Sequence, residues 1–392
     1  MVRISLKLVS PNNQIFIILP KIQYQFIMKY LFSVILFSLC FIAVSAQSNV
    51  YFTSEISPES LVKIYQALGV EAKGNVAVKI STGESSRSNH LSPELIKDLV
   101  QSVDGTLVEC NTAYWGNRNN TAAHLKAIEE RGYNAIADVD IMDSEGEITI
   151  PVSDTKWLDN DIVGSHLSNY DFMINLAHFK GHAMGGFGGV LKNASIGVAS
   201  SRGKSYIHSA GNKTSGAGAD QDSFLESMAA AAQAVHNYFK QEGKDIVYIN
   251  VMNNISIDCD CDGNPHAPEL KDMGILASTD PVALDRACLD LVFNHESVAG
   301  DDASALIRRI ESLHGTHTVE YAEEIGLGTQ SYNLINLDES GESGMEGITD
   351  NQASKVYNVF DLNGNKVLDK AKNLTGLEKG VYIVNGKKQM VN

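Results

Sequence analysis

Hydrophobic and polar residues alternate along the middle of the chain in blocks of two kinds. Short apolar runs bounded by glycine or turn residues predict buried strands, and amphipathic stretches that open on a capping residue predict helices. The predicted strands cover residues 75–80, 105–110, 135–140, 171–177, 245–251 and 274–278. The predicted helices cover residues 92–103, 120–131, 224–240 and 280–293. Strands that alternate with helices predict an α/β fold with a parallel or mixed sheet flanked by helices.

Capping residues place several helix starts. Ser92 precedes Pro93, and Asp280 precedes Pro281. A side-chain oxygen before a proline is typical of a first helical turn, so Ser92 and Asp280 are predicted N-caps. Asp285 lies further along the second of these helices, and we expect it to be solvated.

The beginning of the chain has the pattern of a secretory signal peptide. Lys29 precedes an apolar run over residues 31–44, and the run ends at Val44-Ser45-Ala46. A basic start, a hydrophobic middle and small residues at a cleavage position are the three parts of such a peptide. The alternative is a membrane anchor, but the run falls short of the ~20 apolar residues of a span. Residues 1–46 are therefore predicted to be an N-terminal extension with a signal peptide, which leaves no transmembrane span after cleavage.

The end of the chain differs from the middle. Residues 337–352 are acidic and rich in glycine and serine, which predicts a linker after a core of residues 47–336. Residues 353–392 contain short apolar runs joined by Asn-Gly turns, which predict a small all-β module. Its runs 356–364 and 379–388 resemble the C-terminal sorting domain of the Bacteroidetes type IX secretion system. The resemblance implies that the secretion machinery is a partner and that the protein is secreted or held at the cell surface. The alternative is an ordinary β-hairpin appendage.

Charge and cysteine content exclude several classes. Acidic residues outnumber basic ones by 47 to 31 in 392 residues, which gives a formal net charge of −16. Nucleic acid is not an expected partner, because phosphate-backbone binding needs lysine and arginine to displace counterions. Five cysteines are too few for a disulfide scaffold at this length.

The first segment with candidate chemistry runs from His178 to Asn193. It directly follows a predicted strand, so we expect it to form a loop at the carboxyl end of that strand. Lys180 and Lys192 are candidate catalytic residues that would hold an anionic substrate. His178 and His182 are candidate metal ligands. The candidate ligand-binding residues here share exposed backbone N–H groups or a side-chain amide. They are Gly185, Gly186, Gly188, Gly189 and Asn193. The alternative is a tight glycine connection between packed elements.

The second segment contains Cys259 and Cys261, flanked by Asp258, Asp260 and Asp262. Two thiols beside carboxylates are a candidate site for a transition metal such as iron or zinc. In an oxidising compartment a disulfide is the alternative, either between these two cysteines or with Cys110 or Cys288. A Cys-x-Cys ring is predicted to be strained and therefore redox-active. Inert thiols are the third alternative.

Other polar residues follow the first two predicted strands. Glu84 is a further candidate catalytic residue, and Asn111 and Thr112 are candidate ligand-binding residues. Ligands of α/β sheets bind outside the carboxyl ends of the strands, so these residues should lie near the two segments above. Each alone is more often a cap, a turn or a satisfied core group.

These segments, in this order, resemble domain-of-unknown-function family 362, known from iron–sulfur-associated proteins of anaerobic bacteria and archaea. The matching segments cover residues 78–84, 111–114, 178–193, 258–262 and 274–285. Many members carry a ferredoxin-like insert with two four-iron four-sulfur clusters. Residues 211–219, which stand in its place, contain no cysteine, so these clusters are not expected here. The resemblance implies that a pocket with His178, His182, Lys180, Lys192, Cys259 and Cys261 carries over.

Three hypotheses follow for function. The first is an exported, metal-binding, enzyme-like protein, with oxidoreductase as the candidate activity. The second is a non-catalytic surface protein that binds a small anionic molecule. The third is a structural surface protein whose cysteines form a disulfide. All three depend on whether folding brings the histidine–lysine segment and the cysteine segment to one cavity.

Overall fold

The computed structural model describes residues 47–212, 218–241 and 243–338, together with four strands near the C-terminus. The chain divides into two compact units, Met1–Glu339 and Ser340–Asn392. The predicted signal peptide and residues 339–352 of the predicted linker lie outside the described residues. Among the described helices, none combines the length and hydrophobicity needed to span a bilayer.

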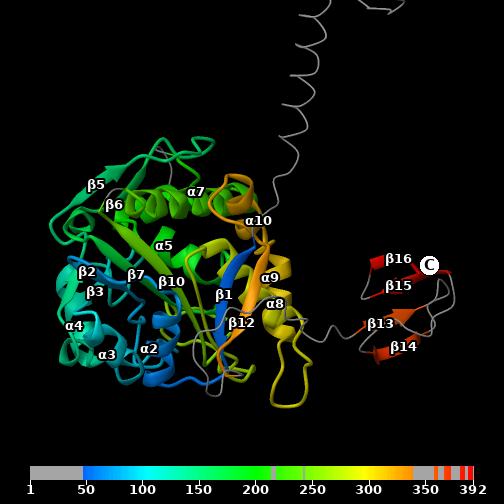
Figure 1. The fold of residues 1–392 in the computed structure, drawn as a ribbon. Coiled ribbons are helices and arrows are strands. Elements are labelled where there is room, and N and C mark those ends of the chain that lie inside the picture. The colour runs from blue at the N-terminus through cyan, green and yellow to red at the C-terminus, as the bar shows by residue number, and fades with distance from the viewer. Residues whose placement is uncertain are drawn as a thin grey trace, which may run out of the picture. The chain divides into compact units, whose positions relative to one another are not determined.

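An eight-stranded sheet forms the centre of the first unit (Figure 1). From edge to edge its strands are β12 (Tyr332–Asn336), β1 (Ser48–Thr53), β11 (Gly274–Ser278), β10 (Asp245–Met252), β7 (Phe172–His178), β2 (Val76–Lys79), β3 (Thr106–Glu109) and β4 (Val139–Ile141). β10, β7, β2, β3 and β4 pair in parallel, and β11 runs antiparallel to both of its neighbours. The predicted α/β fold with a mixed sheet is confirmed.

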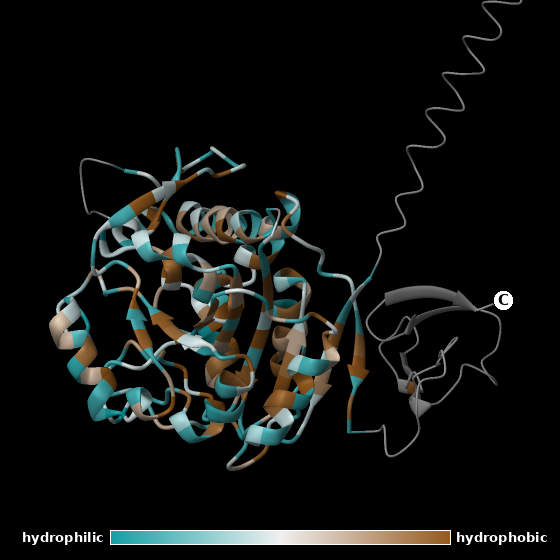
Figure 2. Cartoon of the chain, turned by 60° about the vertical axis from the view of Figure 1, so that its left-hand side comes forward, coloured by the Kyte–Doolittle hydropathy of each residue, from teal (hydrophilic) through white to brown (hydrophobic). Residues whose placement is uncertain are grey.

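Helices cover both faces of this sheet. The helices whose buried residues share a core with one face are α2 (Pro58–Ala67), α3 (Pro93–Ser102) and α4 (Thr121–Glu130). Those on the other face are α5 (Val190–Val198), α6 (Ser201–His208), α7 (Gln221–Phe239), α8 (Pro281–Phe293), α9 (Ser304–Ser312) and α10 (His317–Glu324). Neighbouring strand residues such as Ala77 and Val78 belong to opposite cores, because successive side chains of a strand point to opposite faces. Hydrophobic residues accordingly gather on the central strands (Figure 2).

The strand order contains a switch point. The chain passes from β2 to β3 and β4 towards one edge, and then returns to place β7 on the other side of β2. At such a reversal the connections after neighbouring strands leave in opposite directions and open a crevice at the carboxyl ends. The candidate site therefore belongs between the ends of β2 and β7.

The helix starts predicted at Ser92 and Asp280 are confirmed. The Ser92 hydroxyl accepts a hydrogen bond from the Leu95 N–H, and the Asp280 carboxylate accepts from Val282 and Ala283. The strand predicted over residues 135–140 is wrong for residues 135–138. Gly132, at φ 82°, ends α4, and a 3₁₀ turn η1 (Tyr133–Ala135) follows before β4. The fully buried Tyr133 holds this turn in place through its hydroxyl on the Leu91 carbonyl.

Two further expectations need correction. Residues 180–193 are not one loop: they form a hairpin of β8 (Lys180–His182) and β9 (Gly186–Gly188) and then begin α5. Asp285 is not solvated but fully buried. It accepts hydrogen bonds from the Val190 N–H at 2.9 Å and the Leu191 N–H at 3.0 Å, and so caps α5 from another helix. Burial raises the pKa of Asp285 to about 6.

Smaller sheets complete the two units. A hairpin of β5 (Glu147–Ile150) and β6 (Asp161–Gly164) belongs to the first unit. The second unit is a four-stranded antiparallel sheet in the order β14 (Lys366–Ala371), β13 (Tyr357–Phe360), β15 (Gly380–Val384) and β16 (Lys387–Val391). Strands predicted in the C-terminal module are confirmed for its described residues.

Candidate functional site

A cavity of about 250 Å³ opens at the carboxyl ends of the central strands. The end of β2 contributes Lys79 and Ser81, and the end of β3 contributes Glu109 and Cys110. The β8–β9 hairpin after β7 contributes Lys180 and His182, and the connection after β10 contributes residues 259–261. The histidine–lysine segment and the cysteine segment therefore line one cavity.

The lining is strongly basic. Among the described residues it includes five basic side chains, which are Lys79, Arg118, Lys180, Lys192 and Lys204. Only two carboxylates, of Glu109 and Asp260, line it with them. A protein with a formal net charge of −16 thus concentrates positive charge at one internal surface. Low-dielectric walls strengthen such a field, so the cavity is suited to a small anion.

Three of the lysines are bound to fixed partners. Lys79 Nζ lies 2.6 Å from the Ile80 carbonyl and 3.0 Å from Asn193 Oδ1. Lys204 Nζ donates to the Ala199 carbonyl at 2.6 Å, and Lys180 Nζ forms an ion pair with Asp260 at 2.7 Å. Burial lowers the pKa of Lys79 to about 8.

Lys192 differs from the other lysines. Within the described part of the chain, its Nζ forms no hydrogen bond and no ion pair, although the residue is half-buried and lines the cavity. Burial lowers the pKa of Lys192, because it disfavours the charged form, and repulsion from the nearby Lys180 lowers it further, to about 7. An anionic ligand would supply the missing partner, so Lys192 is the cation best placed to bind one.

Asp260 connects the two segments. It is buried, and its carboxylate contacts His178 Nδ1 at 2.8 Å and Lys180 Nζ at 2.7 Å. Burial alone would raise the pKa of Asp260, but Lys180 and His178 hold it well below its ordinary value. His178 Nε2 lies 2.6 Å from the Asn253 carbonyl, so both nitrogens of this ring already have partners. His178 therefore does not line the cavity and is not one of the groups that could share a metal with the cysteines.

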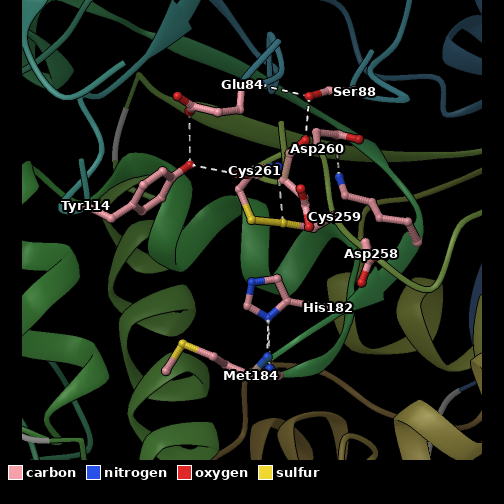
Figure 3. The surroundings of a disulfide bond; sticks show 12 residues. Glu84, Ser88, Tyr114, His182, Met184, Asp258, Cys259, Asp260 and Cys261 are labelled. Carbon is pink, nitrogen blue, oxygen red and sulfur yellow. Dashed lines mark hydrogen bonds and ion pairs between the residues drawn. A yellow bond between two sulfur atoms is a disulfide. The ribbon is translucent and has the colours of Figure 1, made fainter. Parts of the chain in front are cut away.

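Cys259 and Cys261 form a disulfide in the cavity wall. Of the alternatives left open by the sequence, the structure has the bond within this pair, and Cys110 and Cys288 are free and buried. His182 lies directly beside the disulfide, and its other side faces the Met184 backbone (Figure 3). One ligand atom from each of His182, Cys259 and Cys261 lies within 4.8 Å of the others.

The protonation of His182 bears on whether these three groups fit a metal. Its Nδ1 accepts hydrogen bonds from the Gly185 N–H at 2.8 Å and the Met184 N–H at 3.2 Å. Burial, and then the nearby Lys192, hold the pKa of His182 well below its ordinary value, so the ring is neutral and its proton is on Nε2. A metal-binding imidazole normally donates from its second nitrogen, which is the opposite arrangement. With the sulfurs joined as well, the group is compatible with a metal only after the disulfide is reduced and Nδ1 is released.

Glu84 is set back from the cavity. Its carboxylate contacts Arg118 Nε at 3.2 Å and the Tyr114 hydroxyl at 3.3 Å, and it also accepts from the Asn117 N–H. Arg118 in turn contacts Glu109 at 3.3 Å, and this second carboxylate contacts His124 Nε2 at 2.7 Å. Glu84 therefore positions Arg118 and Tyr114, which do line the cavity.

The remaining candidate residues divide between the lining and its support. Thr112, Gly188, Gly189 and Asn193 line the cavity. Gly185 contributes its N–H to His182, and Gly186, at φ 79°, completes the hairpin turn. Asn111 faces elsewhere: its amide donates to Thr121 Oγ1 at 3.1 Å.

Sequence reasoning missed several charged residues of the lining. Lys79 could have been found, because a lysine inside the apolar run of residues 75–80 must either find a partner or face a site. Arg118, Lys204 and Glu109 gave no local signal. They lie in loops, at a strand end and on a helix, and only the sheet topology brings them together.

Comparisons with solved structures find distant similarities. Two of the solved structures that the chain is similar to are the lactate racemase apoprotein from Thermoanaerobacterium thermosaccharolyticum and a protein from Thermotoga maritima solved by structural genomics. The racemase apoprotein is 18% identical to this chain, with a TM-score of 0.34, and the match covers 51% of this chain and 50% of the racemase chain. The Thermotoga maritima protein is 12% identical to this chain, with a TM-score of 0.36, and the match covers 68% of this chain and 58% of the Thermotoga chain. The chain thus spans 50% of the length of the first structure and 58% of the second.

A search of curated proteins finds no match. The model of the family described as "Domain of unknown function (DUF362)" matches residues 76–290, which is more than half of the chain and includes the elements that build the cavity. The chain therefore belongs to the DUF362 family.

Proposed function

We propose that this protein is an oxidoreductase that binds a small anionic thiol in the basic cavity and exchanges electrons with it through Cys259 and Cys261. The observation that carries the proposal is the convergence of a disulfide and five basic side chains on one cavity of about 250 Å³. The basic side chains select the charge of the substrate, and the disulfide supplies the reacting atoms.

The reaction balances as a thiol–disulfide exchange. A substrate thiolate attacks one cysteine sulfur, the Cys259–Cys261 bond breaks, and the other cysteine leaves as a thiolate. A second substrate thiolate attacks the substrate sulfur of the mixed disulfide, and the protein cysteine that held it leaves as a thiolate. Two substrate thiols become one substrate disulfide, and the protein disulfide takes up two electrons and two protons to become two thiols.

The cavity residues have separate roles in this exchange. The proton on His182 Nε2, on the sulfur side of the ring, stabilises the leaving thiolate by a hydrogen bond. Lys192, which lacks a partner among the described residues, holds the carboxylate or phosphate of the substrate. Asp260 and His178 orient Lys180 at the cavity wall.

The test compares small thiols of different charge. We expect 3-mercaptopropionate to reduce the disulfide of the full chain faster than cysteamine does, at equal thiolate concentration. Two unit charges 8 Å apart attract each other by about 2 kcal/mol at an effective dielectric constant of 20, so the expected ratio is at least about tenfold. Trapping with iodoacetamide followed by mass analysis of the peptide with both cysteines measures the rate.

Matched variants locate the effect. Lys192→Gln should remove most of the preference for the anionic thiol, whereas Lys126→Gln, at an exposed lysine on α4, should leave it unchanged. Equal rates for anionic and cationic thiols would overturn the proposed substrate class. Anion binding without any reduction of the disulfide would instead favour a non-catalytic surface protein that binds a small anion.

A metal-dependent activity is the second candidate, and the convergence of His182, Cys259 and Cys261 favours it. Two thiolates and an imidazole suit iron or zinc, and a fourth position open to the cavity is typical of catalytic rather than structural sites. Reduced full chain should then retain about one more equivalent of metal under anaerobic purification than Cys259→Ser/Cys261→Ser does. Reduced protein that retains no more metal than this double variant would end this candidate.

Export is a separate proposal. It is supported by the signal-peptide pattern of residues 28–46 and by the resemblance of residues 353–392 to a sorting domain. Fractionation of cells that express the full chain, followed by mass analysis of the mature ends, tests it. Cleavage after Ala46 and recovery outside the cell are expected, and a cytoplasmic chain with an intact N-terminus would refute it.

A further inference from the structure

A second group of metal-ligating side chains lies away from the basic cavity, where the end of α9 passes into α10 beside α7. It comprises His314, His317 and Glu320, and one ligand atom of each lies within 4.8 Å of the others. The two imidazole rings are stacked, with centroids 4.8 Å apart and planes inclined by 11°. Because a ring nitrogen binds a metal in the plane of its ring, one ring has to turn about its Cβ–Cγ bond for both to bind the same ion. None of these residues lines the cavity described above.

Each imidazole already has a carboxylate on one of its nitrogens. His314 Nδ1 lies 2.6 Å from Asp222 Oδ1, and His317 Nε2 lies 3.2 Å from Glu226 Oε1. Because carboxylates accept hydrogen bonds, these two nitrogens are the donors. The nitrogens left with a free lone pair are therefore His314 Nε2 and His317 Nδ1. This is the usual arrangement of metal-binding histidines, in which an outer carboxylate fixes the tautomer and raises the basicity of the ligand nitrogen.

The third ligand faces the right nitrogen. Glu320 Oε2 lies 3.8 Å from His317 Nδ1, which is the nitrogen that Glu226 leaves free. Two nitrogens and one carboxylate oxygen are the ligand set of catalytic zinc sites, and the absence of sulfur from the set favours Zn²⁺ or a harder divalent cation over Cu(I). Exposure of about half of the His314 and Glu320 side chains leaves room for water as a further ligand.

The outer carboxylates are held in place by helix α7. Asp222 and Glu226 lie four residues apart on this helix, so they share a face. Glu226 is largely buried, and its second oxygen accepts from Lys156 Nζ and from Trp157 Nε1, both at 2.6 Å. The partner of His317 is therefore fixed before any metal arrives, which lowers the entropy cost of assembling the site.

We propose that His314, His317 and Glu320 form a binding site for one divalent transition metal, with Zn²⁺ as the metal of the test, and that Asp222 and Glu226 are its outer carboxylates. The site is independent of the proposed thiol chemistry. A bound ion would connect the segment between α9 and α10 to α7 through these carboxylates, and so stabilise the contact between α10 and α7.

The test titrates tag-free full chain with Zn²⁺ by calorimetry. The parent chain is titrated with its disulfide oxidised, and the titrations are repeated in the Cys259→Ser/Cys261→Ser background, so that thiolates cannot contribute. One equivalent should bind, and His314→Ala or His317→Ala should remove it. Asp222→Asn should weaken binding by about 10- to 100-fold, as expected for an outer ligand partner.

The matched control is His166→Ala. His166 also contacts two carboxylates, of Asp140 and Glu145, and its side chain is as exposed as that of His317, at 20%. Unlike His314 and His317, it has no second histidine ring stacked on it among the described residues. This variant should keep the full equivalent of Zn²⁺. Circular dichroism of each variant confirms that the fold is intact.

A second measurement of metal binding uses fluorescence in place of calorimetry. Trp157 donates to Glu226, so a paramagnetic ion such as Co²⁺ at the site should quench its fluorescence. Trp115→Phe removes the other tryptophan, which is 95% exposed. Quenching that disappears in His317→Ala supports the site. The proposal is overturned if the parent chain binds no Zn²⁺, or if both histidine variants bind it as well as the parent does.

Discussion

Replacing Asp260 by asparagine should destabilise the protein and at the same time strengthen anion binding. Asp260 is buried and lies 2.7 Å from Lys180 Nζ. At that distance two unit charges attract by about 6 kcal/mol at an effective dielectric constant of 20, and desolvation offsets part of this. Asparagine leaves the ammonium group of Lys180 without a counter-charge, next to the low-pKa Lys192.

The expected loss in the free energy of unfolding is about 3–5 kcal/mol, which is typical when one partner of a buried pair is removed. For a unit of this size it corresponds to a fall in Tm of about 6–10 °C. The same change removes one of the carboxylates that line the cavity. The carboxylate of Asp260 repels an anion about 6 Å away by about 3 kcal/mol at the same dielectric constant. Loss of this repulsion should make sulfate bind at least tenfold more tightly.

Thermal unfolding of the full chain over a series of sulfate concentrations measures both effects. The Tm of Asp260→Asn should start below that of the parent and rise more steeply with sulfate. Glu130→Gln is the control, because its exposed pair with Lys126 at 3.7 Å should contribute less than about 1 kcal/mol. A fall in Tm of less than about 2 °C, with a sulfate response equal to that of the parent, would refute the electrostatic reasoning.

The remaining predictions concern pH, packing and the disulfide. Lys192, with its pKa lowered to about 7, is protonated below that pH, so the affinity of the cavity for sulfate should fall as pH rises above 7, and calorimetry should show a weaker pH dependence in Lys192→Gln. The lowered pKa of Lys192 also affects stability in the absence of anions. Between pH 7 and 10 the unfolding free energy of the parent should rise relative to that of Lys192→Gln, because only the unfolded state keeps the proton on Lys192 in this range. Denaturant titrations with the opposite trend would contradict this prediction. Gly189→Ala would place a Cβ 2.3 Å from Asp285 Oδ1, so it should cost about 1–3 kcal/mol, whereas Gly218→Ala, with no atom within 4 Å, should be nearly neutral in the same denaturant titration. The peptide that contains Cys259 and Cys261 should take up no iodoacetamide from denatured, unreduced protein and two alkyl groups after reduction, and uptake without reductant would show that the pair is not a disulfide.

Local sequence patterns were enough to predict most of the central strands and four of the nine α-helices in the described residues. The strand of residues 75–80 could be predicted because apolar residues fill a segment between turn signals, and the helix at Pro281 because Asp280 supplies an N-cap. These features depend on interactions between residues a few positions apart. The strand predicted over residues 135–140 failed where a distant contact, between Tyr133 and Leu91, decided the backbone.

The order of chemical segments also determined where a site would lie, since residues after parallel strands meet at one edge of a sheet. Tertiary structure alone decided what the site contains. It placed His178 on Asp260 and left His182 beside the sulfurs, although both histidines lie in the same short segment. It also buried Asp285, which caps a helix 95 residues earlier in the chain. Ion pairs and hydrogen bonds form between groups that are close in space. The sequence therefore shows which charged and polar groups are present, but not which of them interact. Their pairing, and with it the positive charge of the cavity, follows only from the packing of the strands and helices.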